Sequence, residues 1–397
     1  MFAQAEKKLR VLELVNVRWW NACAEYGVHL ALGLHRRGHR VIVVGGENSL
    51  ALREAQRLGL PVRPTKMESH HPATFLSSLL ALVRLVRRER IQVINAHRAE
   101  GHLCAALASL LLREKVVVVR TRGDVRSPKG HWLNRILHHR LTDAIVLPSK
   151  AMRKPVSEAL GLSANKLCLI PPGVDLRRFA NLRSKEEWRK TLGWTDQGTV
   201  VGIVGRYSPV KGHRVFLKAA HLVLKANPQT TFVIVGHEAQ IKTADLQGLA
   251  RRLGFADRVR FTGFVPDVTP YIGAFDVAVV ASLGSEVICR VTLEYMAAAK
   301  PVVGTTVNAI PEIVVHGSTG LLVPPGNPGA MSEAILSLAQ NPQKARALGQ
   351  AGRRRVEEEF TIDHLVQRTE ALYWQVIEAR HGGASKSRTV SLTEQGS

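Results

Sequence analysis

The sequence is poor in cysteine, in aromatic residues and in long apolar runs. Its four cysteines lie far apart without a CxxC pair, which excludes a disulfide framework and a zinc site of usual spacing. Aromatic residues make up 5% of the chain, and without a helix-turn-helix, zinc-finger or RNA-binding signature we expect no nucleic-acid partner. The longest uncharged apolar runs, such as residues 103–112, are too short to span a bilayer.

Acidic residues are also scarce, with 32 Asp and Glu against 55 Lys and Arg, a net charge of +23. Residues 1–170 hold 28 basic against 12 acidic residues, a net of +16, and residues 171–397 hold 27 against 20, a net of +7. A basic front half suggests a polyanionic partner, such as anionic lipid headgroups or a phosphorylated substrate. The alternative is a basic surface that only keeps the protein in solution. The N-terminus shows no signal-peptide pattern, so we expect a cytoplasmic protein.

What the sequence does have is a regular alternation of short β-branched runs with amphipathic helical segments. Strands are expected at residues 9–15, 39–46, 91–97, 116–121, 144–149, 199–205, 230–236, 258–264, 276–282, 301–306 and 319–324, and helices at 23–38, 75–90 and 101–114. Continuous apolar strands that alternate with helices indicate parallel sheets covered on both faces. The pattern restarts near residue 198, so we expect an α/β protein with two doubly wound, Rossmann-like domains.

These domains have expected boundaries. We expect an N-terminal domain over 1–175, a linker rich in turn residues and charge over 176–192, and a C-terminal domain over 193–360. A helix over 361–380 should pack back toward the N-terminal domain, and the polar tail 381–397 should be disordered. Ligands bind outside the carboxyl ends of strands in such sheets, so two facing sheets predict a cleft between the domains.

One strand–loop unit, VGIVGRYSPVKGH (201–213), carries two cations after its strand. Arg206 can bind two phosphate oxygens, and Lys211 adds a point charge. Gly205 and Gly212 allow the backbone to come close to a ligand. The unit fits a diphosphate, and the alternative is an ordinary basic loop.

A second stretch, GSEVICRVTLEYMA (284–297), places two carboxylates, Glu286 and Glu294, in an apolar segment. We expect a helix that begins near Glu286. Its unpaired first-turn amides would form an anion site. Those amides belong to Ile288, Cys289 and Arg290. Carboxylates bind sugar and ribose hydroxyls well. In the alternative, Glu286 only complements the helix dipole and Glu294 extends as a lone charge to solvent.

This glutamate pair, with seven residues between and following a Gly-Arg-x4-Lys-Gly loop, resembles the retaining glycosyltransferases of family four. Further matches are RGHRVIVVGG (37–46), IQVINAH (91–97), LIPPGVDLRRF (169–179), VIVGHE (233–238), FTGFVPD (261–267) and IPEIVVHGSTGLLVPPGN (310–327). The resemblance covers nearly the whole chain. It implies the GT-B fold, in which two Rossmann-like domains face each other across a cleft.

The resemblance also implies roles for individual residues. Catalytic roles fall to Glu286, Lys211, Arg206 and His97. By the resemblance the N-terminal domain would bind the acceptor and the C-terminal domain the nucleotide-sugar, the latter through Arg206, Lys211, Phe264, Val265, Glu286 and Glu294. The loop patterns described above add Gly205 and the amides of Ile288, Cys289 and Arg290 to the residues expected to bind the nucleotide-sugar. Arg206 and Lys211 would hold the diphosphate, and the backbone near Phe264 and Val265 the base. Glu294 would bind the ribose hydroxyls and Glu286 those of the transferred sugar.

His97 closes the strand at 91–97, where a histidine in some family members touches the transferred sugar. The alternative is a hydrogen-bonded loop histidine. The chain departs from the family at three pairs of residues, where the family often has Gly-Gly, Phe-Gly and Gly-Gly. These pairs are Asn21-Ala22, Ile288-Cys289 and Asn308-Ala309.

One basic amphipathic segment, SPKGHWLNRILHHRLTD (127–143), is of the kind that lies on an anionic membrane surface. Its apolar residues include Trp132, Leu133, Ile136 and Leu137, and its basic ones Lys129, Arg135 and Arg140. The alternative is a helix whose apolar face packs on the core.

The resemblance thus implies a retaining transferase that moves a hexose-type sugar from a UDP, GDP or ADP donor to a hydroxyl of an envelope glycan or glycolipid, such as lipopolysaccharide. The sequence carries no acidic metal-binding cluster, so we predict metal-independent transfer and no tightly bound cofactor. The enzyme would be cytoplasmic, or peripheral on the inner face of the membrane. The alternatives are a sugar-nucleotide epimerase, a phosphorylase, for which no cofactor lysine is marked, or a non-catalytic nucleotide-sugar-binding protein.

Overall fold

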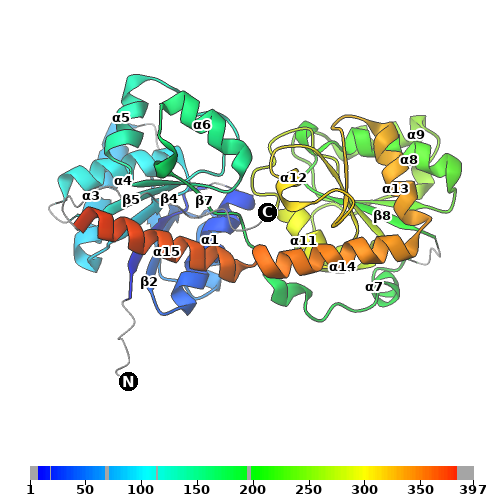
Figure 1. The fold of residues 1–397 in the computed structure, drawn as a ribbon, viewed down its shortest axis with the longest axis horizontal. Helices are drawn as coiled ribbons and strands as arrows, with labels where there is room; N and C mark the ends of the chain where they lie inside the picture. The colour runs from blue at the N-terminus through cyan, green and yellow to red at the C-terminus, as the bar shows by residue number, and fades with distance from the viewer. Residues whose placement is uncertain (1–7, 18, 68–70, 113–114, 195–197, 382–397) are drawn as a thin grey trace. The chain divides into compact units, whose positions relative to one another are not determined.

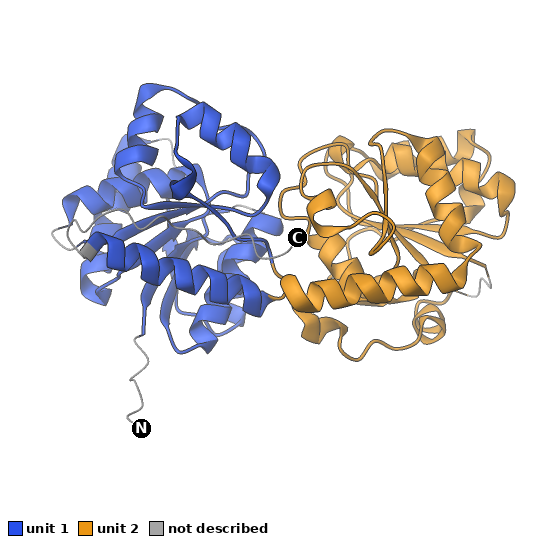
Figure 2. Cartoon of the chain, in the orientation of Figure 1, with its two compact units in different colours: residues 1–172, 362–397 blue, residues 173–361 orange. Residues whose placement is uncertain are grey.

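A computed structural model describes residues 8–17, 19–67, 71–112, 115–194 and 198–381 (Figure 1). All of the expected disordered tail except residue 381 lies outside the described residues. The chain forms two compact units, one of residues Met1–Pro172 with Ile362–Ser397 and one of residues Gly173–Thr361 (Figure 2). We call them unit 1 and unit 2.

Unit 1 contains a seven-stranded parallel sheet with the strand order β3-β2-β1-β4-β5-β6-β7. Its strands are β1 (Arg10–Leu14), β2 (Arg40–Gly46), β3 (Val62–Thr65), β4 (Val93–Ala96), β5 (Val117–Thr121), β6 (Ala144–Leu147) and β7 (Leu167–Leu169). Its α-helices are α1 (Ala22–Arg36), α2 (Leu50–Arg57), α3 (Pro72–Glu89), α4 (Ala99–Leu111), α5 (Trp132–Arg140), α6 (Arg153–Leu160) and α15 (Ile362–His381).

Unit 2 contains a six-stranded parallel sheet with the order β10-β9-β8-β11-β12-β13. Its strands are β8 (Val200–Val204), β9 (Thr231–Val235), β10 (Val259–Phe261), β11 (Val277–Val280), β12 (Val302–Thr305) and β13 (Leu321–Val323). Its α-helices are α7 (Lys185–Thr191), α8 (His213–Ala226), α9 (Thr243–Arg252), α10 (Thr269–Ala274), α11 (Arg290–Ala297), α12 (Ile310–Ile313), α13 (Pro328–Ala339) and α14 (Pro342–Glu359).

The core of unit 2 shows why its strands read as continuous apolar runs. Val201 and Ile203 of β8 belong to one buried cluster with helices α8, α9 and α13. Val200 and Val204 of the same strand belong to a second cluster with α11, α12 and α14. Because successive side chains of a strand point to opposite faces, the two clusters lie on the two sides of the sheet. The expected doubly wound α/β architecture is confirmed.

The C-terminal helix α15 belongs to unit 1 because it packs on α1. A Cβ added at Gly33 would lie 2.2 Å from Val366, so only a glycine lets the helices approach this closely. Glu370 accepts a hydrogen bond from Arg37 (2.6 Å) and lies 3.0 Å from His39. The two helices are therefore joined by close packing and by charge.

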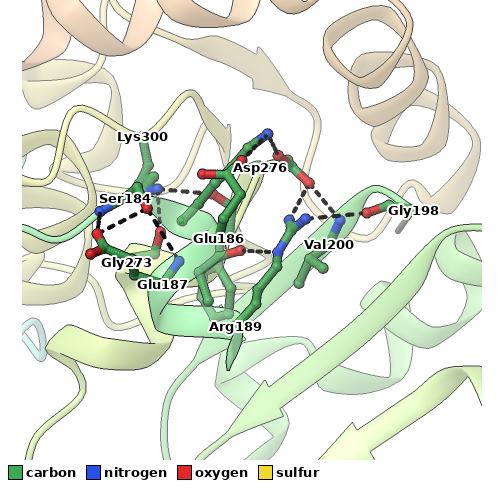
Figure 3. Close-up of polar contacts among 12 residues, drawn as sticks. Ser184, Glu186, Glu187, Arg189, Gly198, Val200, Gly273, Asp276 and Lys300 are labelled. Carbon is green, nitrogen blue, oxygen red and sulfur yellow. Dashed lines mark hydrogen bonds and ion pairs between the residues drawn. The ribbon is translucent and has the colours of Figure 1, made fainter. Parts of the chain in front are cut away.

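The segment 176–192, expected to be a linker, is built into unit 2 through α7 (Figure 3). Asp276, which precedes β11, pairs with Arg189 (2.5 Å) and Lys185 (2.8 Å) of this helix. Burial opposes the charge on Asp276, but Lys185 and Arg189 lower the pKa of its carboxyl below the ordinary value. Lys300 donates to the carbonyls of Gly273 (2.6 Å) and Phe275 (3.0 Å) beside the helix. The segment is thus tied to the amino end of the sheet.

Candidate functional site

The candidate donor site lies in unit 2, where β8 and β11 are neighbours and the strand order reverses. Loops that leave two such strands diverge and leave room for a ligand at their carboxyl ends. Here the two loops also contact each other, since Leu283 donates its backbone N–H to the carbonyl of Val210 (2.8 Å). Gly212 has φ +70°, and a Cβ there would lie 1.8 Å from the carbonyl oxygen of Ala281. Glycine is required at this approach.

The contact between the loops brings Lys211 and Glu286 together in an ion pair. Glu286 is buried, and its Oε1 also accepts a hydrogen bond from Ser282 (2.8 Å). Its backbone N–H donates to the side chain of Asn308 (3.2 Å). Lys211 is only half-buried, so its ammonium group can also face a ligand.

Helix α11 begins at Arg290, so the expectation that it begins near Glu286 is wrong. The residues before it form an irregular loop with two left-handed positions, Ser285 (φ 60°) and Cys289 (φ 47°). The two glutamates therefore do not lie on one helix. In the described part of the chain, no hydrogen-bond acceptor contacts the amides of Ile288 or Cys289, which leaves these donors available to a ligand.

Glu294 is the fifth residue of α11, and its side chain is 0% exposed. The alternative that placed this carboxylate in solvent is therefore wrong. Its Oε1 accepts a hydrogen bond from Arg178 (2.9 Å) and lies 3.7 Å from Nη1 of Arg290. Its Oε2 is buried without a hydrogen-bond partner among the described residues. Burial opposes the charge of Arg178, but Glu294 and Asp267 raise the pKa of the guanidinium above its ordinary value.

The remaining predicted donor residues lie in loops of the same sheet. Gly205 follows β8 and donates its N–H to Val235 (2.9 Å), and Arg206 next to it is exposed. Phe264 follows β10, is 73% exposed and packs edge-on against His237 at 5.7 Å between ring centroids, while Val265 is half-buried. Within the described residues, neither Arg206 nor Phe264 forms a hydrogen bond or an ion pair with either glutamate.

His97 lies in unit 1, directly after β4 and at that sheet's own reversal of strand order between β1 and β4. Its side chain is fully buried, and Nε2 lies 2.7 Å from Oε2 of Glu13. Glu13 also accepts hydrogen bonds from Asn95 (3.0 Å) and from Tyr373 of α15 (2.9 Å). The alternative of a hydrogen-bonded histidine therefore holds for Nε2 of His97. Its Nδ1 has no hydrogen-bond partner among the described residues.

Two polar residues near His97 were not singled out from the sequence. Arg120 of β5 is buried and donates to the carbonyls of Ala96 and Thr121, both at 2.8 Å. Burial lowers the pKa of its guanidinium to about 10. Asn16, after β1, is buried with neither side-chain polar atom hydrogen-bonded to a described residue. Such groups suit a polar ligand better than a closed core.

The three departures from the family pattern have local explanations. Asn21 caps α1, because its side chain accepts hydrogen bonds from the amides of Cys23 and Ala24, both at 3.0 Å. Asn308 adopts φ 45° and Cys289 φ 47°, both in the left-handed region that glycine favours. Asparagine tolerates that region through its short polar side chain, whereas cysteine is an unusual choice.

Helix α5 carries the apolar residues of the basic amphipathic segment. Trp132 is 68% exposed, Leu133 56% and Ile136 44%, so the alternative in which these residues pack on the core is wrong. Lys129, Arg135 and Arg140 are exposed on the same segment. Among the described helices, none combines the length and the apolar character that a membrane span needs.

Residues 24–178 match the family model described as Glycosyltransferase Family 4, and residues 198–341 the model described as Glycosyl transferases group 1. The two matches omit only the ends of the chain and a short middle segment. The structure of Anabaena HepE in complex with UDP has a TM-score of 0.82 and 22% identity, covering 92% of this chain and 100% of that chain. The expected GT-B fold class is therefore confirmed.

Two curated relatives are more similar in sequence. A D-inositol 3-phosphate glycosyltransferase of Segniliparus rotundus is 29% identical over 269 residues, 67% of this chain and 57% of that protein. A GDP-mannose-dependent alpha-(1-6)-phosphatidylinositol monomannoside mannosyltransferase of Mycolicibacterium smegmatis is 32% identical over 220 residues, 53% of this chain and 56% of that protein. The chain thus matches little more than half the length of each.

Proposed function

We propose that this chain, which belongs to Glycosyltransferase Family 4, moves a hexose-type sugar from a nucleoside-diphosphate donor to an acceptor hydroxyl, with retention of configuration. One observation carries the proposal: two buried carboxylates, each paired with a cation, lie where the strand order of unit 2 reverses. One of them, Glu294, has an oxygen without a hydrogen-bond partner among the described residues, which suits a site that binds hydroxyl groups.

The donor diphosphate is the group that the loop after β8 suits best. Arg206 is exposed and Lys211 half-buried beside the amides of Ile288 and Cys289, so charge and hydrogen-bond donors can face one anion. In the transfer, the bond between the anomeric carbon and the diphosphate oxygen breaks, and the electron pair goes to the diphosphate. Fixed donors and cations that neutralise this developing charge lower the barrier. Lys211 and Arg206 would do so.

The hydroxyls of the donor have two candidate partners. Glu286, held by Lys211 and Ser282, would bind the transferred sugar, and Glu294 the ribose. The acceptor oxygen forms the new bond to the anomeric carbon, and its proton goes to the departing phosphate. The backbone near Phe264 and Val265 would hold the base. HepE of Anabaena is described in complex with UDP, which makes UDP the first donor base to try, before GDP and ADP.

His97 is proposed to contact the transferred sugar through Nδ1. Glu13 holds Nε2, which fixes the ring and leaves Nδ1, which has no hydrogen-bond partner among the described residues, to face the sugar. A sugar hydroxyl is a suitable donor to that nitrogen.

An anionic acceptor fits the basic unit 1. The fully buried Arg120 has no carboxylate within ion-pair distance among the described residues, and Arg98 and Arg122 lie in its electrostatic surroundings. The two curated relatives are named for inositol phosphate and phosphatidylinositol acceptors, which are also anionic. We therefore propose a phosphorylated or lipid-linked glycan acceptor, of the lipopolysaccharide type or a related envelope glycan.

A lipid-linked acceptor would bring the protein to a membrane surface, and α5 offers a contact. Its exposed Trp132, Leu133 and Ile136 can enter the headgroup boundary while nearby cations bind anionic lipid. More of the protein should float with phosphatidylglycerol vesicles than with phosphatidylcholine vesicles. The double variant Trp132→Ala, Leu133→Ala should no longer float with phosphatidylglycerol vesicles. Equal flotation with both lipids would refute this contact.

The first test of the function is a thermal-shift and product-release screen with UDP-, GDP-, ADP- and CMP-sugars. We expect one donor class to stabilise the protein and to release nucleoside diphosphate slowly, without added metal and in the presence of EDTA. Binding without any release, even with acceptor extracts, would favour a non-catalytic binding protein. No stabilisation by any donor would overturn the assignment of the donor site.

A further inference from the structure

We propose that Arg178 is a positioning residue for Glu294 and makes the donor site select ribose over 2′-deoxyribose. The proposal rests on the proposed function, since it takes the nucleotide of the donor as the ligand. It assigns a role to a residue of the segment where the chain enters unit 2 at Gly173.

The first observation is that the two oxygens of the Glu294 carboxylate have different surroundings. One oxygen, Oε1, accepts a hydrogen bond from Nη1 of Arg178 at 2.9 Å. The other, Oε2, is buried and has no partner among the described residues. A buried carboxylate without a counter-charge is unfavourable, and Arg178 supplies that counter-charge to Glu294. A buried oxygen without a donor is also unfavourable, and a ligand hydroxyl would satisfy it.

The second observation is that Arg178 is itself held in place. Its Nη2 donates to Oδ1 of Asp267 at 3.1 Å, and the same oxygen accepts from the backbone N–H (3.0 Å) and the hydroxyl (2.8 Å) of Thr269. The planar guanidinium therefore joins two carboxylates in one fixed geometry, which a lysine could not reproduce. Rotation of the Glu294 carboxylate is restricted, and Oε2 keeps one direction.

We call the pairing of Arg178 with Glu294 and Asp267 the clasp, and the third observation connects this clasp with the base. Asp267 belongs to the loop after β10 that also carries Phe264 and Val265, the residues proposed to lie against the base. A ribose lies between base and diphosphate in any nucleotide. A fixed acceptor beside the base loop therefore suits the ribose hydroxyls, and a carboxylate oxygen accepts two hydrogen bonds from a diol.

The local backbone explains why Arg178 reaches this position. It lies in the short 3₁₀ turn Leu176–Phe179, in which the Asp175 side chain accepts a hydrogen bond from the backbone N–H of Arg177 (3.0 Å). Phe179 is buried, and the Arg178 guanidinium lies 5.4 Å from the centre of its ring. Arg177, one residue earlier, pairs with Asp175 (2.8 Å) and is mostly exposed. Arg177 therefore offers a matched control in the same turn.

The test is binding of three nucleotide pairs by titration calorimetry: UDP and 2′-deoxy-UDP, GDP and 2′-deoxy-GDP, and ADP and 2′-deoxy-ADP. For the pair that binds, the wild type should prefer the ribonucleotide by about 10- to 100-fold, the range for a hydrogen bond to a charged group. Arg178→Gln should reduce this preference to about threefold or less, mainly by weakening the ribonucleotide. Arg177→Gln should keep the wild-type preference.

If the clasp only stabilises the fold, the calorimetric result should be different. If Arg178→Gln weakens both members of a pair equally and the preference survives, the proposal is overturned. Thermal unfolding checks that the variant is folded, and Asp267→Asn provides a second, milder change to the same clasp, with an expected intermediate preference. If no nucleotide of any pair binds to the wild type, both the donor site and this proposal fail. Binding to the wild type with equal affinity for both members refutes only the selection.

Discussion

Replacing Tyr373 by phenylalanine tests the buried polar network of unit 1. The Tyr373 hydroxyl donates to Oε1 of Glu13 at 2.9 Å, and both side chains are fully buried. Burial and the neighbouring Glu13 charge raise the pKa of the Tyr373 hydroxyl, which keeps its proton available to donate. Oε2 of Glu13 is already occupied by His97 and Asn95. The substitution removes one oxygen, leaves no large cavity, and leaves Oε1 without its donor.

The expected loss follows from the charge of the acceptor. A hydrogen bond to a charged group contributes about 1.5–3 kcal/mol, so the free energy of unfolding of unit 1 should fall by about that amount. The control is Tyr26→Phe, the same chemical change at another buried tyrosine of unit 1. Tyr26 donates to the neutral carbonyl of Ile170 at the longer distance of 3.3 Å. Tyr26→Phe should therefore lower the free energy of unfolding of unit 1 by about 0.5–1.5 kcal/mol.

Because the chain has two units, a single unfolding transition is not assured, and the measurement should report on unit 1 alone. Native-state hydrogen exchange, read by mass spectrometry on peptides that contain β1 and β4, gives the opening free energy of that sheet. A loss in Tyr373→Phe no larger than in Tyr26→Phe would refute the reasoning, because the hydrogen bond to the Glu13 carboxylate would then contribute no more than one to a neutral carbonyl.

Three further predictions concern the donor loop and acid stability. Lys211→Ala should reduce turnover at least about 100-fold, because the departing diphosphate loses a cation that neutralises it, and it should lower the melting temperature, because buried Glu286 loses its counter-charge; near-normal turnover would contradict the diphosphate assignment. Gly212→Ala should lower the melting temperature and abolish donor binding, because its Cβ would lie 1.8 Å from the carbonyl of Ala281; unchanged binding would mean that the loop can move. Burial lowers the pKa of His138 to about 4 from its ordinary 6.5, so the unfolded chain binds a proton that the folded chain excludes. Stability should therefore be complete above pH 6.5 and fall towards pH 4 by about 1.4 kcal/mol per pH unit, a slope that His138→Gln should reduce in urea titrations at pH 5 and 7.

Most of the sheet core could be predicted because its strands are continuous β-branched runs. Strands such as β5 and β8 are buried along their whole length, and their sequences are short, mainly β-branched runs that are typical of strands in a parallel sheet covered on both faces. The edge strand β3 was missed, and its sequence VRPT explains why. It contains Pro64, is partly exposed and has four residues, so its pairing with β2 comes from the neighbouring strand and not from its own pattern.

The start of α11 could not be predicted from local sequence, because it depends on two residues in the left-handed region. Cys289 and Ser285 have no strong preference for positive φ, so nothing in GSEVICR marks the irregular loop. The helix was therefore predicted to begin near Glu286, whereas the first residue of α11 is Arg290. The family pattern, with a glycine at the position of Cys289, was the available signal for a backbone conformation of this kind.

The partners of the two glutamates show a related limit of sequence reasoning. Lys211 and Glu286 were both assigned to the donor site, and the ion pair between them follows from the topology, which brings the loops after β8 and β11 to one edge of the parallel sheet. Arg178 had no predicted role, since nothing in its spacing relates it to a residue 116 positions later. What required a partner was Glu294 itself, a carboxylate between Leu293 and Tyr295 in an apolar helix. Burial of that charge obliges some cation to approach one oxygen, and the second oxygen stays available only because the first is satisfied by a guanidinium fixed elsewhere.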